Sequence, residues 1–429
     1  MASVQTPLEV VLVLHFLTNY TARHNHTVTN FQQSHLSPRR SKVLLTGPTK
    51  SPDISRHLCL PPGVTPVSAE LRRDRGTPAL QQICHTPQLK KLDHSLLMSP
   101  NQRLKTLTNH LQTPKMKLLY PTSLHIDTKS LEGFSVELHP YDVTQPIPES
   151  LIDAEFLVTW SNKASNLRDA ASRMKNLRWI QSLAAGPNDV LAAGFDASRV
   201  SITTGSGLHD ETVAEHTLGL LLNAARRFYE MRDYQSRGEW PGHLGGAQPD
   251  RAPGTFRTLK GANVTIWGFG NIAKCLAPVL TALGANVTGV ARSTGVRNGF
   301  EVVAEDRLQD VLPKTDALVM ILPGSASTNG ALNAQRLALL PKHAWIVNVG
   351  RGTSVDEDAL LEALEKGSIG GAALDVFSAE PLPKESKLYA APNLILSPHA
   401  AGGRPREAEA LIAYNLRRIL AGQELKNII

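Results

Sequence analysis

The sequence is poor in cysteine and has no long hydrophobic run. Its 429 residues include only three cysteines, Cys59, Cys84 and Cys275, which are too few and too far apart for a disulfide framework or a zinc cluster. The longest apolar run near the start, Val10–Leu17, is broken by His15 and is far shorter than the about 20 residues of a membrane-spanning helix. These absences predict a protein of a reducing compartment that holds no metal and does not cross a membrane.

Acidic residues are scarce in one part of the chain only. The formal net charge is +7, and residues 1–115 contain 14 Lys and Arg against 5 Asp and Glu. The rest of the chain has 31 basic and 33 acidic residues and is slightly acidic. It lacks the basic block interleaved with aromatic residues that a nucleic-acid platform needs. The sequence therefore predicts no nucleic-acid partner.

Residues 1–115 also lack any sustained hydrophobic period, and we predict a disordered or targeting extension. Basic residues such as Arg23 and Arg39 are balanced only by Glu9 over the first ~50 residues, as is typical of the acid-poor mitochondrial presequences. The expected location is cytoplasmic, with a mitochondrial one left open. A translation start at Met116 fits the change in composition equally well.

From Met116 onward, short apolar runs alternate with helix-compatible stretches, which predicts parallel sheets covered on both faces. Asp210–Arg237 reads as one long helix that crosses from a first alternating unit to a second, and Arg406–Leu420 as the last helix. We expect an α/β protein with two doubly wound parallel-sheet domains. The expected strands of the first unit are Lys117–Tyr120, Phe134–Leu138, Phe156–Trp160, Trp179–Leu183 and Val200–Thr203, and those of the second are residues 264–267, 286–290, 317–322, 344–349, 371–376 and 394–397.

A glycine-rich turn follows the first strand of the second unit. Gly268 permits a tight turn, Gly270 lets the backbone approach a pyrophosphate, and the small Ala273 lets helix pack on strand. The N–H groups at the start of the following helix, at Asn271 and Ile272, would meet the phosphates. This context predicts a dinucleotide site. Pro278 lies inside the expected helix and predicts a bend there.

The end of the next strand lacks the acid that binds the ribose of NAD. Ala291 stands in that place and is followed by Arg292, Ser293 and Thr294. An arginine and two hydroxyl groups can donate to a 2′-phosphate, and no carboxylate repels it. The sequence predicts NADP(H) as the preferred cofactor and leaves NAD(H) open.

Three polar residues follow later strands, at the sheet edge where open α/β sheets bind ligands. A carbonyl that accepts a hydride develops negative charge on its oxygen and needs a proton donor and a nearby cation. His399 can donate the proton, Glu380 can orient the imidazole, and the planar fork of Arg351 suits a substrate carboxylate. These residues predict hydride transfer to a 2-oxo acid.

From Met116 to the end, the sequence resembles the D-isomer-specific 2-hydroxyacid dehydrogenase family. The matching motifs are Gly268–Ala273, Asn348–Gly352, Ala373–Phe377, Glu380–Pro383 and Ser397–His399. The resemblance implies that Arg351, Glu380 and His399 are the catalytic set and that the protein is a homodimer. It also implies a flavodoxin-like substrate domain of residues 116–210 and 399–429, and a Rossmann NAD(P)-binding domain of residues 211–398. The implied substrate contacts are Ala185, Gly186 and Arg351, and the further cofactor contacts are Leu322, Pro323, Val349, Gly350, Asp375, His399 and Gly402.

Within this family the chain looks most like the NADPH-dependent glyoxylate/hydroxypyruvate reductases, from Trp160–Lys163, Ala291–Thr294 and Glu380–Pro383. Asn162 or Lys163 is expected at the far end of the small substrate. Only 30 residues follow His399, which implies a short member without a regulatory tail. The alternative is a nucleotide-sensing corepressor on the same fold, because a fold alone does not settle function. Pro187 departs from the family's usually glycine-rich substrate loop.

Overall fold

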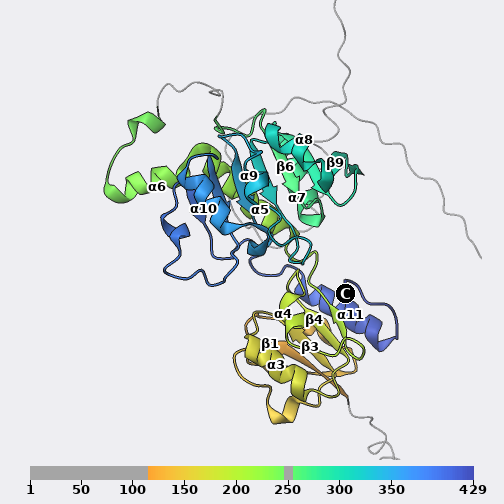
Figure 1. The fold of residues 1–429 in the computed structure, drawn as a ribbon. Helices are drawn as coiled ribbons and strands as arrows, with labels where there is room; N and C mark the ends of the chain where they lie inside the picture. Colours follow the sequence, from red (N-terminus) through yellow and green to blue (C-terminus); the bar gives the residue numbers. More distant parts are fainter. Residues whose placement is uncertain (1–114, 246–254) are drawn as a thin grey trace, which may run out of the picture. The chain divides into compact units, whose positions relative to one another are not determined.

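The computed structural model describes residues 115–245 and 255–429. These residues form two parallel β-sheets flanked by helices (Figure 1), which confirms the predicted α/β fold class. The extension predicted at residues 1–115 lies, apart from Lys115, outside the described residues. No helix within the described ranges is both long enough and apolar enough to cross a bilayer.

The first sheet has five parallel strands in the order β2-β1-β3-β4-β5. This is the flavodoxin-like order of a doubly wound sheet. Both faces of this sheet are buried: Leu118 packs into the core on one face, and the next residue, Leu119, packs into the core on the other. The strands are therefore apolar at successive positions rather than at alternate ones. The strands are β1 (Met116–Pro121), β2 (Val136–Tyr141), β3 (Phe156–Thr159), β4 (Trp179–Ser182) and β5 (Ser201–Thr203).

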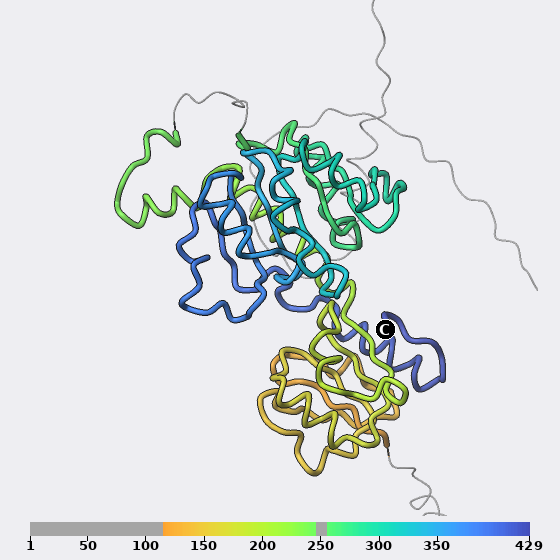
Figure 2. Tube along the Cα trace, in the orientation of Figure 1, coloured from red at the N-terminus to blue at the C-terminus, as the bar shows by residue number. Residues whose placement is uncertain are grey.

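Helices from both ends of the chain cover this first sheet. One face packs against α3 (Ala164–Arg173) and α4 (Asn188–Ala192). The other face packs against the C-terminal helix α11 (Ala408–Leu420), which Figure 2 shows beside strands from the start of the described chain. Two short 3-10 helices, η2 (Thr128–Leu131) and η3 (Glu149–Leu151), lie in its loops. The last helix was expected to begin at Arg406, but Glu407 has a left-handed φ of 56°, so α11 begins two residues later, at Ala408.

The long crossover helix predicted over Asp210–Arg237 is wrong as a single element. It is divided into α5 (Asp210–Arg226) and α6 (Phe228–Arg237) by Arg227, whose φ is 56°. The helix α5 buries seven residues, whereas α6 buries none. Its contact with the core comes from the partly buried Tyr229, so few contacts require α6 to continue the axis of α5. A 3-10 turn, η4 (Gly242–Leu244), follows α6.

The second sheet has eight strands in the order β13-β12-β11-β10-β6-β7-β9-β8, all parallel except the edge strand β8. The chain order reverses between β6 and β10, which is the switch point where such sheets bind ligands. The sequence prediction missed β8 and β9. The strands are β6 (Asn263–Trp267), β7 (Asn286–Ala291), β8 (Gly295–Arg297), β9 (Phe300–Ala304), β10 (Ala317–Met320), β11 (Trp345–Asn348), β12 (Gly371–Leu374) and β13 (Leu394–Leu396).

Helices cover both faces of the second sheet as well. The crossover helix α5 and the helix α7 (Asn271–Ala282) share one core with it. The other core includes residues of α8 (Leu308–Val311), α9 (Ala334–Leu337) and α10 (Glu357–Glu365). Pro278 lies inside α7, and its effect on the helix axis stays a prediction. The connecting 3-10 turns are η5 (Glu305–Arg307), η6 (Leu312–Lys314), η7 (Gly352–Ser354) and η8 (Lys387–Ala390).

Candidate active site

The glycine-rich turn joins β6 to α7 at the switch point of the second sheet. Gly268 has a φ of 102°, and a Cβ there would collide with the main chain just after β10, so the position requires glycine. Gly270 is the N-cap of α7, and a Cβ there would meet nothing within 4 Å. The N–H groups of Asn271, Ile272 and Ala273 belong to the first turn, where a helix offers no carbonyl partners. This open helix end fits a pyrophosphate.

The end of β7 is rich in polar donors, and one of them was missed from the sequence. Arg292 is exposed after Ala291. Arg297 in β8 donates to both the carbonyl and the hydroxyl oxygen of Ser293, at 3.2 and 2.9 Å, and to the carbonyl oxygen of Phe269 in the glycine-rich turn at 3.4 Å. A second guanidinium therefore joins the predicted pair of Arg292 and Ser293.

The sequence next to Arg297 contains a β-hairpin signal, which a search for parallel strands alone does not detect. It precedes Asn298 and Gly299, and an Asn-Gly pair is the strongest short-range mark of a β-hairpin. Both residues have positive φ values, 52° and 82°, as the type I′ hairpin turn requires. The hairpin of β8 and β9 folds Arg297 back beside the end of β7.

Two further loops come together beside the glycine-rich turn. The N–H of Val349 donates to the carbonyl of Met320, and a Cβ on Gly350 would come within 2.6 Å of the Leu322 nitrogen. Leu322 and Val349 are buried, while Pro323 is exposed. Leu322, Val349 and Gly350, which are predicted to contact the cofactor, thus lie close together at the carboxyl ends of β10 and β11.

Arg351 lies against the loop after β4. Its guanidinium donates to its neighbour's carbonyl, that of Gly350, at 2.7 Å, and a Cβ on Gly186 would collide with its second terminal nitrogen. The N–H groups of Ala185 and Gly186 take part in no hydrogen bond with the described part of the chain. A cation beside two available N–H groups is suited to a carboxylate.

His399 and Glu380 form a direct pair. The Nδ1 of His399 lies 2.6 Å from a carboxylate oxygen of Glu380, and the other oxygen accepts from the N–H of Phe377 at 2.9 Å. The imidazole side chain is 48% exposed, so a substrate can reach it. His399 has a φ of 53°, an uncommon backbone conformation of the kind that recurs at functional sites. With Nδ1 held by Glu380, Nε2 is the nitrogen available for proton transfer.

The loop that carries His399 is held by a buried carboxylate. Asp375 accepts from the hydroxyl of Ser397 at 2.6 Å and from the N–H groups of Ala400 and Ala401, both at 2.9 Å. His216 of α5 lies 3.4 Å from the same carboxylate and was not foreseen in this role. The sequence signal for it is its place in the Ala-Glu-His start of the crossover helix. Asp375, predicted as a cofactor contact, directs its carboxylate to this loop.

The remaining predicted residues are less directly placed. The carbonyl of Gly402 accepts from the hydroxyl of Thr212 at 2.7 Å. The amide of Asn162 is engaged with Tyr141, Asn166 and the N–H of Trp160, and the contact of Asn162 or Lys163 with the far end of the substrate stays a prediction. In the described ranges no three His, Cys, Asp or Glu side chains are placed to hold a metal ion.

Together these elements provide a proton donor, a fixed cation, two available N–H groups and an open helix end. An imidazole paired with a carboxylate can give a proton to a carbonyl oxygen as charge develops there. A guanidinium such as that of Arg351 can hold a carboxylate in a fixed orientation. The chemistry that such a set supports is reduction of a 2-oxo acid.

Many known proteins are similar to this sequence. Residues 218–401 match the family described as D-isomer specific 2-hydroxyacid dehydrogenase, NAD binding domain. A glyoxylate reductase of Aeropyrum pernix is 33% identical over 321 residues, which cover 72% of this chain and 93% of that protein. A D-3-phosphoglycerate dehydrogenase of Methanocaldococcus jannaschii is 29% identical over 324 residues, and the match spans only 59% of its length.

Solved structures resemble the fold over the same part of the chain. A D-isomer specific 2-hydroxyacid dehydrogenase family protein from Aeromonas salmonicida has a TM-score of 0.64 at 29% identity and covers 74% of this chain and 99% of its own. An NADPH-dependent glyoxylate/hydroxypyruvate reductase from Sinorhizobium meliloti, in complex with NADP and sulfate, has a TM-score of 0.62 at 26% identity. That match covers 73% of this chain and 98% of the reductase.

Proposed function

Since the chain belongs to the D-isomer specific 2-hydroxyacid dehydrogenase family, and so is an oxidoreductase acting on CH–OH groups, we propose that it reduces a small 2-oxo acid of the glyoxylate or hydroxypyruvate type. The product would be a D-2-hydroxy acid. The observation that carries the proposal is the 2.6 Å pair of His399 and Glu380. The glyoxylate reductase of Aeropyrum pernix and the Sinorhizobium meliloti reductase support the substrate class.

Each residue of the site has a defined task in this reaction. The nicotinamide cofactor, when bound, supplies the hydride. His399 donates a proton from Nε2 to the substrate's carbonyl oxygen, and Glu380 holds the ring in the donating orientation. Arg351 binds the carboxylate and polarises the carbonyl, and the N–H groups of Ala185 and Gly186 hold the carboxylate from the other side.

The tasks divide between two domains. We assign substrate binding to residues 116–210 and 399–429, and cofactor binding to residues 211–398. The pyrophosphate would lie on the start of α7, as the open space at Gly270 supports. The proposed cofactor contacts are Gly268, Gly270, Asn271, Ile272, Ala273, Arg292, Ser293, Leu322, Pro323, Val349, Gly350, Asp375, His399 and Gly402.

NADPH is the proposed cofactor in preference to NADH. Ala291 leaves no carboxylate to bind a ribose 2′-hydroxyl or to repel a 2′-phosphate. Arg292, Ser293 and Arg297 offer donors at the same strand end. A charge-assisted hydrogen bond contributes about 1.5–3 kcal/mol, which is on the order of ten- to a hundred-fold in affinity.

The proposed assembly is a homodimer. The helix α6 buries no residue, and the large apolar side chains of Phe228 and Trp240 are 53% and 95% exposed. Phe228 lies at the start of α6 and Trp240 three residues after its end, and large exposed apolar side chains of this kind are typical of an interaction surface. The proposed compartment is the cytoplasm, with a mitochondrial location left open by the composition of residues 1–115.

Steady-state kinetics with the purified full-length protein test this proposal. Consumption of NADPH and of NADH is measured with glyoxylate, hydroxypyruvate, pyruvate and 2-oxoglutarate at one pH, and the product's configuration is determined by chiral chromatography. We expect the highest kcat/KM with NADPH and one of the two smallest polar substrates. Equal or better use of NADH would refute the cofactor preference. Absence of turnover with every 2-oxo acid would refute the enzymatic proposal and favour the corepressor alternative.

A further inference from the structure

A buried histidine outside the proposed catalytic set has two carbonyl groups as partners. The side chain of His209, just before α5, has its Nε2 2.8 Å from the carbonyl oxygen of Leu183 and its Nδ1 3.0 Å from that of Gly402. The residue is only 5% exposed. Its ring stacks on Trp160, with centroids 5.3 Å apart and an interplanar angle of 15°. Packing on one face and two polar contacts thus fix this imidazole in place.

The two carbonyls belong to the two loops that the proposed reaction brings together. Leu183 lies two residues before Ala185, whose N–H is assigned to the substrate carboxylate, and Gly402 lies three residues after His399. The segments next to them are joined again by the N–H of Arg406, which donates to the carbonyl of Leu208 at 2.9 Å.

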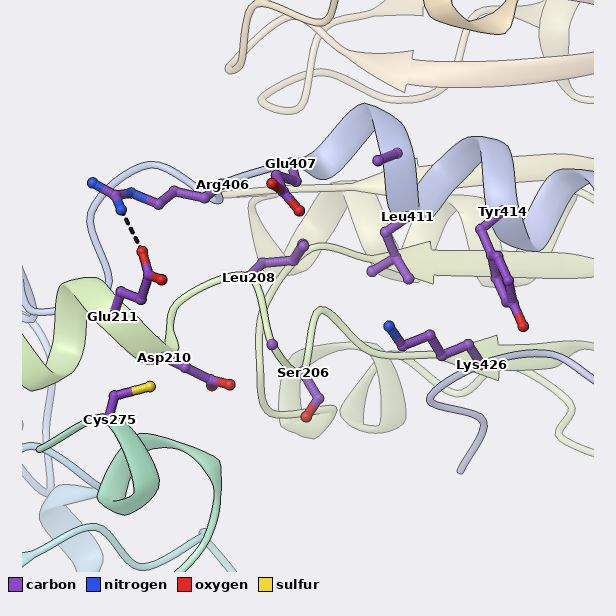
Figure 3. A pocket seen from close by; sticks show the side chains of 12 residues that line it. Ser206, Leu208, Asp210, Glu211, Cys275, Arg406, Glu407, Leu411, Tyr414 and Lys426 are labelled. Atoms are coloured by element: carbon purple, nitrogen blue, oxygen red, sulfur yellow. Dashed lines mark hydrogen bonds and ion pairs between the residues drawn. The ribbon is translucent and has the colours of Figure 1, made fainter. Parts of the chain in front are cut away.

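An ion pair continues this connection along the chain. The guanidinium of Arg406 lies 2.6 Å from a carboxylate oxygen of Glu211, as the dashed line in Figure 3 marks. This pair is exposed and contributes little on its own. His209 is therefore the buried side chain that links the two loops directly.

The partners of the ring determine its protonation. A neutral imidazole has one N–H, so with two carbonyl acceptors one ring nitrogen would direct its lone pair at an oxygen lone pair. The doubly protonated ring donates to both. The ring stacks on the face of Trp160, and an aromatic face attracts cations.

We propose that His209, as an imidazolium, is a positioning residue of this enzyme. By donating to Leu183 and Gly402 at once, it sets the carboxylate-binding loop at the correct distance from the loop that carries the proton donor. The expected effect on turnover rests on the proposed function, whereas the link between the two loops does not. Orientation of reacting groups is worth large factors in rate, so a loosened link between the loops lowers turnover although His209 touches no reacting atom.

The kinetic test uses His209→Phe, which keeps a ring to stack on Trp160 and removes both donors. We expect kcat/KM for the 2-oxo acid to fall about ten- to a hundred-fold, through both a lower kcat and a higher KM. The Kd of NADPH, measured by fluorescence, should change less than about threefold, because the pyrophosphate and 2′-phosphate contacts remain. His139→Phe, on β2 of the same sheet, is the matched control and should retain wild-type kinetics. Wild-type kcat/KM in folded His209→Phe would overturn the proposal.

Nuclear magnetic resonance tests the protonation without any turnover. In the wild-type full chain with ¹⁵N-labelled histidine at pH 7, both ring nitrogens of His209 should carry protons, and their signals are assigned by their loss in His209→Gln. One protonated and one bare nitrogen would overturn the imidazolium. If the wild type reduces no 2-oxo acid, the proposed function fails, while this spectrum still decides the link between the loops.

Discussion

At the scale of single residues, His399 is the group on which turnover depends most. Its Nδ1 lies 2.6 Å from a carboxylate oxygen of Glu380, and the side chain is 48% exposed, so the ring is accessible to a substrate. His399→Ala should lower kcat about 10²–10⁴-fold, the usual worth of a positioned acid. Stopped-flow measurement of hydride transfer and equilibrium binding of NADPH are the readouts, and cofactor binding should persist because the phosphate contacts lie elsewhere.

Glu380→Gln separates the role of the carboxylate from that of the ring. The amide can still accept a hydrogen bond from Nδ1, but without the carboxylate charge that bond is weaker and holds the ring less firmly. Turnover should lie between those of wild type and His399→Ala. His125→Ala, on the loop after β1, is a control for the loss of an imidazole and should leave kcat unchanged. Near-normal turnover in His399→Ala would assign the proton to another group.

At the scale of elements, the hairpin of β8 and β9 should carry part of the cofactor preference. Arg297 in β8 donates to Ser293 and to the glycine-rich turn, so it presents a cation to the end of β7. Arg297→Ala should raise the KM for NADPH about tenfold and leave that for NADH nearly unchanged, because only the 2′-phosphate requires the charge. Arg307→Ala, at the end of η5 just beyond the hairpin, is the matched control. An equal loss with both cofactors would indicate a structural role for Arg297.

The contact between α5 and α7 makes a second prediction at this scale. Cys275 of α7 lines a pocket of about 540 Å³ with Asp210 and Glu211 of α5 (Figure 3). Burial, and then the two nearby carboxylates, raise the pKa of the Cys275 thiol above its ordinary value. The thiolate is the reactive form, so alkylation of Cys275 should be slower at pH 8 than that of a free peptide thiol and should accelerate at higher pH.

Asp210→Asn removes one of these negative neighbours and should speed that alkylation by about twofold. Mass spectrometry of the peptide that contains Cys275 gives the rate, so the other two cysteines do not interfere. Asp189→Asn, in the first turn of α4, is the control and should have no effect. A labelling rate equal to that of the peptide thiol would contradict the raised pKa.

At the scale of the whole molecule, the described fold accounts for every residue assigned to the site. The assigned side chains and glycines lie between Ala185 and Gly402, and the strands that hold them begin at Met116. A chain starting at Met116 should therefore fold and retain the kcat and KM of the full-length protein. Steady-state kinetics and thermal unfolding of both chains are the measurements. Loss of folding or of turnover would assign a structural or catalytic part to residues 1–115.

Much of the fold could be predicted from the sequence because its signals are local. Strands such as Phe156–Thr159 and Ala317–Met320 are buried on both faces, so each is an uninterrupted apolar run that stands out in the sequence. The glycine-rich turn is likewise encoded at its own positions, since Gly268 has a φ that other residues rarely adopt. Where core contacts are few, as beyond Arg227, the sequence pattern predicted one continuous helix and missed the break at Arg227.

What the sequence determined by itself is the order of strands and helices and the chemical types of residue at the strand ends. Only the tertiary structure decided which of these side chains meet. The pairing of His399 with Glu380 and the approach of Arg351 to Gly186 join residues from separate loops. Neither partner of such a contact carries a local mark of the other, because the contact follows from the packing of whole elements. The two carbonyl partners of His209 are the clearest case: a lone histidine before a helix has no pattern that indicates them.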